Sequence, residues 1–263
     1  MTSAICLATV SRIFARAKPW QSLMTQYFVD KVLGNRETRM IEVDGRPVTP
    51  AWNYTQAEKI ADGFIHVIGL ALAVCGGGTL VVLASRSASW STIATVGVYA
   101  TSLVVALAFS AAYNMSPASG TKCLLRRCDQ AAIFLLIGGT YTAFLTRAAS
   151  DPASLFVLAA VCAVATLGAL LKLVLPGRLE RLSLAAYLAL GWSGLVLFPT
   201  AIKVLPITAV CLIALGGLLY TAGVIFHMWK RLRFQNAIWH AFVLLAAGCH
   251  YGAVLECLVF ART

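Results

Sequence analysis

The chain has 263 residues; 60% are hydrophobic, 12% are charged, and the mean hydropathy is +0.82. A soluble domain of this length cannot bury so large an apolar share, so the composition excludes a soluble protein and predicts an integral membrane protein. The net charge is +11, but no basic face with interleaved aromatic residues lies outside the apolar runs. We therefore expect membrane lipids as partners and no nucleic acid, and the sequence indicates no specific protein partner.

The first 54 residues are predicted to be a cytosolic tail. The opening "MTSAICLATVSRIFARAKPW" has too short an apolar core, with basic residues on the wrong side, for a cleaved signal peptide. Met24, Phe28 and Val32 recur at helical spacing, which predicts an amphipathic helix over 21–34. That helix either lies on the inner leaflet or packs under the membrane helices.

The stretch "EVDGRPVTPAW" reads as a turn-rich linker between the tail and the membrane domain. It contains the pair Asp44-Gly45 and two prolines, which disfavour helix until Thr55. The predicted domains are accordingly a tail over 1–54 and a membrane domain over 55–263.

Seven charge-free runs follow, each long enough for a transmembrane helix, which needs about 20 apolar residues. The runs are 63–85, 87–121, 130–146, 152–171, 182–202, 204–226 and 234–255. The long second run is expected to span from near Trp90 to near Tyr113 and to end at "MSPASG", since Pro117 and Gly120 continue a helix poorly. The predicted fold is an all-α bundle of seven transmembrane helices, and the glycines of "IGGTY" and the alanines around Ser110 predict close helix contacts.

The connections between these runs are alternately rich and poor in lysine and arginine. The rich segments hold Arg12, Arg16, Lys18, Lys31, Arg36, Arg39, Arg46 and Lys59, then Lys122, Arg126 and Arg127, then Lys172, Arg178 and Arg181, then Lys230, Arg231 and Arg233. The poor segments hold Arg86, Arg147, Lys203 and Arg262. The positive-inside rule then predicts a multi-pass protein of the cell (inner) membrane with its N-terminus in the cytosol and its C-terminus outside.

Cysteine usage favours neither a disulfide framework nor a cysteine zinc site. Five of the eight cysteines fall in or at the ends of the apolar runs, where cysteine behaves as a small apolar residue. Cys123 and Cys128 share a predicted cytosolic loop, and a disulfide is disfavoured in that reducing compartment.

Polar residues in or beside the lipid are functional candidates, because they are costly there. The candidates are Glu58, Asp62 and His66 at spacings of four, Ser110 and Asn114 at the end of the second span, Asp129 at the opening of the third, Asn236 and His240 at the opening of the seventh, and His250 deeper in it. With the topology above, all except His250 are expected to converge near the cytosolic membrane surface.

Each candidate also has a purely structural explanation. Thr55 and Glu58 match a capping box, and Asp62 and Asp129 could favour the positive end of a helix dipole. The Ser110 hydroxyl can return to a backbone carbonyl of its own helix. His250 is best explained as a hydrogen-bonded packing residue. None of these explanations accounts for the predicted convergence.

Four motifs resemble those of a known family. They are "YTQAEKIADGFIHVIG", "SAAYN", "LRRCDQAAIFLLIGGTYTAF" and "NAIWHAFVLLAAGCHYGA". Over about 55–259 the chain resembles the hemolysin III proteins, which are bacterial members of the progestin and adiponectin-Q receptor (PAQR) family. The wider group of seven-helix proteins includes alkaline ceramidases.

The resemblance implies a zinc ion near the cytosolic surface, held by three histidines, with an aspartate contacting a metal-bound water. Ser110 matches the serine of the second motif, Asp129 the aspartate, and His240 one histidine of the last motif. Asn114 and Asn236 occupy the other two histidine positions. An amide oxygen replaces imidazole poorly on zinc, so the family site is predicted to be degraded.

Two arrangements of the site remain open. In one, Asp62, Asp129, His240 and His66 form a displaced, carboxylate-rich metal site. In the other, which we favour, Asn114, Asn236, His240 and Asp129 form a hydrogen-bond network without metal. The corresponding functions are a non-enzymatic, receptor-like or membrane-homeostasis protein, or a zinc-dependent lipid amidase or related hydrolase resembling ceramidases, with Ser110 and Asp129 as catalytic candidates. The ligand count favours the first.

Overall fold

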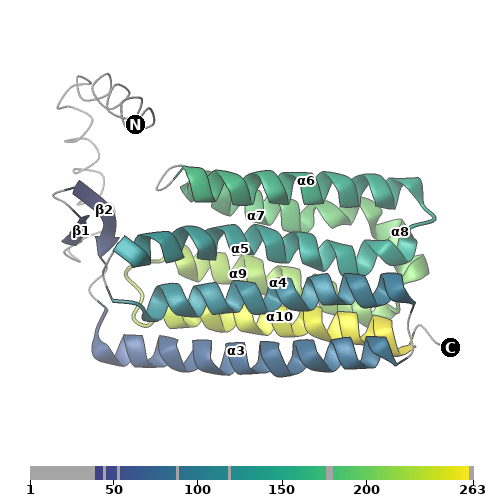
Figure 1. Ribbon diagram of the computed structural model, residues 1–263, viewed down its shortest axis with the longest axis horizontal. Helices are drawn as coiled ribbons and strands as arrows, with labels where there is room; N and C mark the ends of the chain where they lie inside the picture. The colour runs from purple at the N-terminus through teal and green to yellow at the C-terminus, as the bar shows by residue number, and fades with distance from the viewer. Residues whose placement is uncertain are drawn as a thin grey trace, which may run out of the picture. The chain divides into compact units, whose positions relative to one another are not determined.

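The structure is a computed structural model, and it describes residues 39–43, 46–51, 54–86, 89–117, 120–175 and 180–260. Within these ranges, seven helical segments are long and apolar enough to cross a membrane, which confirms the predicted number. They lie side by side in one bundle (Figure 1). The all-α fold class is thus confirmed, whereas the predicted amphipathic helix over 21–34 lies outside the described residues. The orientation of the termini stays a prediction.

Five of the seven spans are single α-helices over their whole length. These are α3 (Gln56–Ser85), α4 (Trp90–Met115), α6 (Pro152–Val174), α9 (Ile207–Met228) and α10 (Gln235–Phe260). The third span consists of α5 (Gly120–Leu145) continued by the short 3-10 helix η1 (Thr146–Ala148). The helix starts follow local chemistry, since Thr55 and Glu58 form the predicted capping box on α3 and Asp151 caps α6 ahead of Pro152.

The segment before the bundle holds a β-hairpin that the linker interpretation missed. Strands β1 (Arg39–Val43) and β2 (Arg46–Ala51) pair antiparallel, with Val43 opposite Arg46. The sequence did contain a signal, because an Asp-Gly pair between strand-like runs favours a tight hairpin turn. The prediction that this stretch is not helical is confirmed for the residues of β1 and β2.

Helix α5 begins about three turns before the apolar run that predicted it, and this corrects two expectations. Asp129 does not open the helix but lies in its third turn, so interaction with the helix dipole does not explain it. Cys123 and Cys128 lie on α5 instead of in a loop, and both are free thiols. The reason is that helix formation depends on backbone hydrogen bonds, which charged residues such as Arg126 and Arg127 do not interrupt.

The fifth span is broken, although its apolar run predicted one helix. It consists of α7 (Glu180–Trp192), the 3-10 segment η2 (Ser193–Leu197) and α8 (Phe198–Val204). Pro199 lies in the first turn of α8, where its missing N–H costs least. The Tyr141 side chain of α5 holds the break: its hydroxyl lies 2.6 Å from the donating Gly194 amide and 2.9 Å from the Leu190 carbonyl.

The helices pack as a closed ring in which α3 contacts α4 and α10, α4 contacts α5, and α9 joins α10 to α7, while α6 packs on α5. Small residues allow these approaches. A side chain at Gly139 would collide with Ser102 of α4, and a Cβ at Gly138 would touch Ala165 of α6 at 3.5 Å. The close contacts predicted for "IGGTY" are therefore confirmed. Because α3 and α10 are neighbours that begin at the same end of the bundle, their first turns meet there (Figure 1).

Candidate functional site

Glu58, Asp62 and His66 are buried along one face of α3, as their spacing predicted. Glu58 does more than complete the capping box. Its Oε1 atom accepts a hydrogen bond of 3.0 Å from the backbone amide of Phe234, which has a positive φ of 57°. Glu58 therefore fixes the chain just before α10 against the start of α3.

Asp62 is the centre of the polar cluster at this end of the bundle. Its Oδ1 lies 2.6 Å from Nδ1 of His240, and its Oδ2 accepts a hydrogen bond of 2.7 Å from the Asn236 amide. Both partners lie on α10, so one carboxylate on α3 binds two side chains one turn apart. Asp62, Asn236 and His240 therefore meet where the sequence predicted that the first and seventh spans converge.

The hydrogen bonds continue from α10 to α4. The Asn236 amide also donates to Oδ1 of Asn114 at 3.1 Å, and the Asn114 amide donates to the backbone carbonyl of Ser110 at 2.9 Å. The two asparagines that stand at the family's histidine positions therefore bond to each other. This chain of contacts links α3, α4 and α10.

His66 lies beside the centre of the cluster without being hydrogen-bonded into it. Its ring is 4.3 Å from the His240 ring, and its Nε2 is 3.6 Å from Oδ2 of Asp62. That nitrogen is buried and has no hydrogen-bond partner among the described residues. Buried imidazole nitrogens normally find a partner, so this one indicates a place where a ligand would be stabilised.

Asp129 and Ser110 border the cluster from α5 and α4. The Ser110 side chain lies within hydrogen-bonding reach of the Asp129 carboxylate, and His66 lies nearby. Asp129 is therefore a neighbour of the cluster, whose central carboxylate is Asp62. The predicted network had Asp129 among its members and did not include Asp62.

His250 lies away from the cluster, three turns further along α10. Its Nε2 is 3.3 Å from the Ile213 carbonyl, its ring is 5.6 Å from that of Tyr220, and it packs closely against Gly216. These contacts are typical of a histidine that packs between helices, as predicted.

Gln235 and His227 lie beside the cluster and were not among the predicted site residues. The Gln235 side chain is almost fully buried and donates to the His227 carbonyl at 3.0 Å, and the His227 ring is 4.9 Å from that of Trp239. A signal was available, since His227 is one of only four histidines in the chain and Gln235 precedes Asn236.

The three family positions do not fit a zinc ion. Only His240 supplies an imidazole, whereas Asn236 and Asn114 could offer a metal only neutral amide oxygens, which are poor zinc ligands, and the Asn114 oxygen already accepts from Asn236. A different set does fit. Asp62, His66 and His240 are all buried and offer one carboxylate oxygen and two imidazole nitrogens within 4.8 Å of one another.

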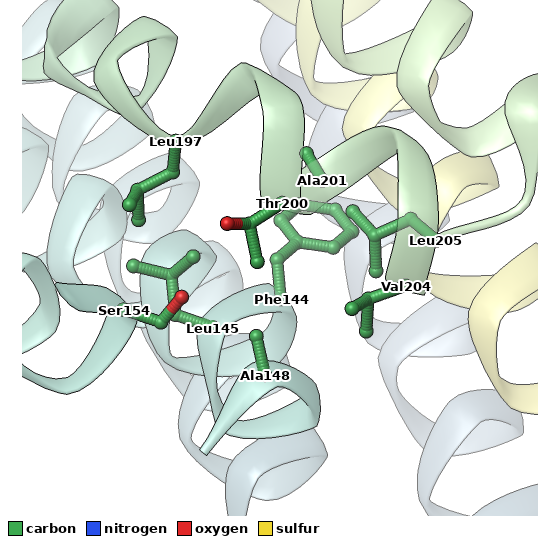
Figure 2. A pocket seen from close by; sticks show the side chains of 9 residues that line it. All are labelled: Phe144, Leu145, Ala148, Ser154, Leu197, Thr200, Ala201, Val204 and Leu205. Carbon is green, nitrogen blue, oxygen red and sulfur yellow. The ribbon is translucent and has the colours of Figure 1, made fainter. Parts of the chain in front are cut away.

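A small cavity lies at the other end of the bundle, where α5 finishes and α8 passes (Figures 1 and 2). Figure 2 shows Phe144 among its apolar lining residues, with the hydroxyl-bearing side chains of Ser154 and Thr200 at the edge. Those hydroxyls are near Asp151, which accepts hydrogen bonds from both. This cavity is thus remote from the polar cluster.

Seven apolar helices with a buried polar cluster at one end define a multi-pass membrane protein of the seven-helix type. Comparison with known proteins identifies the kind more closely. A family model described as "Haemolysin-III related" matches residues 54–251. The chain belongs to the hemolysin III family.

Individual relatives agree with this assignment. The chain is similar to the Hemolysin-3 homolog of Bacillus subtilis (strain 168), with 31% identity over 202 residues, which cover 77% of this chain and 95% of that protein. It is similar to Hemolysin-3 of Bacillus cereus, with 31% identity over 198 residues, 75% of this chain and 90% of that protein. The human monocyte to macrophage differentiation factor, a PAQR-family protein, is 26% identical over 132 residues, 50% of this chain and 54% of its own length.

Proposed function

We propose that this hemolysin III-family protein is a non-enzymatic, receptor-like membrane protein that adjusts or senses the state of membrane lipids. The observation that carries the proposal is that Asn236 donates to both Asp62 and Asn114. The altered family positions are hydrogen-bonded to each other and to α3, so they act as a connection between helices. A hydrolase that used the family's zinc site would need metal ligands at those positions.

The cluster ties together three helices at one end of the bundle, and this supports a sensing role. A membrane whose thickness or order changes alters the tilt and separation of transmembrane helices. Contacts between α3, α4 and α10 would respond to such changes, because buried hydrogen bonds have narrow distance and angle requirements. The proposed output is a shift in the packing of these three helices.

The direct test is a lipid-hydrolysis assay on the purified protein reconstituted in vesicles that contain ceramide and common glycerolipids. Release of free fatty acid is measured by mass spectrometry for the unaltered chain and for His240→Ala. We expect equal, background release from both. Turnover that is abolished in His240→Ala would overturn the proposal.

The sensing role needs its own measurement. We expect the acyl-chain composition and the membrane order of a bacterial host to change on expression of the chain. The change should be lost with Asp62→Ala, which removes the hydrogen bonds from Asp62 to His240 and Asn236, and kept with His250→Ala. Indistinguishable lipid profiles for the unaltered chain and an empty-vector host would count against a homeostatic role.

A metal-dependent lipid hydrolase is the second candidate, and the proximity of Ser110 to Asp129 favours it. Both residues border the set of Asp62, His66 and His240 that could hold a zinc ion. Zinc bound there would supply activated water near neutral pH. Asp129 could then hold a proton, with Ser110 orienting its carboxylate. The same vesicle assay decides between the candidates.

We further propose that the protein spans the cell (inner) membrane with residues 1–54 in the cytosol, so that the cluster lies near the cytosolic surface. The distribution of lysine and arginine supports this orientation. A periplasm-active phosphatase fused after Thr263 should be active, and the same enzyme fused ahead of Met1 inactive. The reverse result would invert the topology.

A further inference from the structure

We propose that Asp62, His66 and His240 form a divalent-cation site of mixed carboxylate and imidazole chemistry, displaced onto α3 from the family's positions on α4 and α10. The site would join α3 to α10 and make their packing depend on the ion. The structural and regulatory role of the ion rests on the proposed non-enzymatic function. The test of the site is a binding measurement, which can fail or succeed apart from the lipid assay.

The donor atoms lie within 4.8 Å of one another, and one pair already has the spacing that a single ion requires. Zinc binds imidazole nitrogen and carboxylate oxygen at roughly 2.0–2.2 Å, so two ligands of a tetrahedral ion lie about 3.4 Å apart. The His66 Nε2 and Asp62 Oδ2 atoms are 3.6 Å apart. The His240 Nδ1 and Asp62 Oδ1 atoms are 2.6 Å apart, and an ion between the side chains would replace that hydrogen bond.

His66 is the observation that points to a ligand. Only 5% of it is exposed, and within the part of the chain that the structure describes its Nε2 atom has no hydrogen-bond partner, yet that atom lies 3.6 Å from the Asp62 carboxylate. A packing histidine in a low-dielectric bundle would normally have both its polar atoms satisfied. A cation shared with Asp62 and His240 gives this nitrogen its missing interaction.

The surrounding residues would orient and balance the ligands. The Asn236 amide donates to Asp62 Oδ2, which restricts rotation of the carboxylate, as outer-shell hydrogen bonds do in metal sites. Asn114 in turn accepts from Asn236. The Asp62 carboxylate contributes one negative charge, which would partly compensate a divalent ion.

The chemistry favours zinc or a similar borderline-soft cation over magnesium or calcium. Two imidazoles with one carboxylate suit zinc, cobalt or nickel, whereas magnesium and calcium prefer sites made of oxygen ligands. With three protein ligands, a fourth position is open for water or for a group from a lipid. The family set would instead rely on His240 and two asparagines, and it would not involve His66.

The test uses the full chain, purified in detergent, stripped with a chelator and dialysed against zinc. Bound zinc is measured by elemental mass spectrometry for the unaltered chain and for His66→Ala, Asp62→Asn and His240→Ala. We expect near-stoichiometric zinc in the unaltered chain and at least a tenfold loss of affinity in each variant. His250→Ala is the matched control, since it removes a half-buried histidine of α10 outside the cluster and should bind as the unaltered chain does.

A gain-of-signal variant protects the test against misfolding. In His66→Cys, cobalt should show a sulfur-to-metal charge-transfer band that the unaltered chain lacks, because a thiolate would replace the imidazole at the same position. Zinc-free unaltered protein under saturating zinc would overturn the proposal. So would zinc that persists in His66→Ala, since that would place the ion on a ligand set that does not include His66. Zinc binding together with lipid hydrolysis would uphold this site and overturn only the non-enzymatic function.

Discussion

The Nδ1 atom of His240 lies 2.6 Å from the Oδ1 atom of Asp62, and this contact joins α10 to α3 across 178 residues of sequence. Both side chains are buried, with at most 8% exposed. A carboxylate in such a place is costly unless polar partners surround it. Asp62 therefore depends on His240 and Asn236, and they depend on it.

The first prediction concerns removal of that carboxylate. Asp62→Ala should lower the free energy of unfolding by about 2–4 kcal/mol, because it leaves the buried His240 ring without its partner and removes one acceptor of the half-buried Asn236 amide. Asp62→Asn keeps an acceptor oxygen and should cost about 1 kcal/mol. Thermal unfolding in detergent, followed by tryptophan fluorescence, provides the comparison. Equal losses of unfolding free energy for the two variants would contradict a stabilising role for the hydrogen bonds to Asp62.

The second prediction uses two adjacent glycines with different neighbours. Gly139→Ala should destabilise the protein by about 1–3 kcal/mol, because the new Cβ collides with Ser102 and pushes α5 from α4. Gly138→Ala is the matched control. Its Cβ would meet Ala165 at 3.5 Å, which is ordinary contact, so its melting temperature should stay close to that of the unaltered chain. Similar melting temperatures for both variants would contradict the close approach of α4 and α5.

Much of the fold follows from the sequence, because hydrocarbon enforces a simple rule. Every backbone group within the membrane must be paired internally, so each long apolar run has to be a helix. The break in the fifth span escaped this reasoning, because it depends on a tertiary contact. The Gly194 amide binds the hydroxyl of Tyr141, which is 53 residues away.

The candidate site was only partly predictable for a related reason. Helical spacing places Glu58, Asp62 and His66 on one stripe, and the shared depth of the span ends indicates that they meet α10. Periodicity does not determine which carboxylate faces His240. The sequence favoured Asp129 as the carboxylate of the network around His240. The carboxylate that contacts the His240 ring is Asp62. Asp129 lies in the third turn of α5, because α5 begins earlier than its apolar run.

The third prediction addresses the broken span. Tyr141→Phe should destabilise the protein by about 1–2 kcal/mol, because the Gly194 amide and the Leu190 carbonyl lose the same hydroxyl. Hydrogen exchange should accelerate at 190–194 before it changes elsewhere.

Tyr99→Phe is the control for Tyr141→Phe. The Tyr99 hydroxyl is buried without a hydrogen-bond partner among the described residues, so its removal should be neutral or slightly stabilising. A larger loss for Tyr99→Phe than for Tyr141→Phe would refute this account.

The last prediction is a pH dependence at Asp151, which caps α6 in the connection between the third and fourth spans. Hydrogen bonds to its carboxylate, above all from Ser154 and also from Ala153 and Thr200, hold the pKa of Asp151 below its ordinary value of 3.8. A group with a lowered pKa in the folded state stabilises that state above its unfolded pKa, and the effect disappears as the pH falls toward the folded pKa.

The variant Asp151→Asn tests this pH dependence, because it keeps a capping oxygen but cannot titrate. The melting temperature of the unaltered chain should therefore exceed that of Asp151→Asn by a constant amount at neutral pH, and the difference should shrink only below about pH 4. A difference that grows on acidification would mean that the carboxylate is destabilised in the fold.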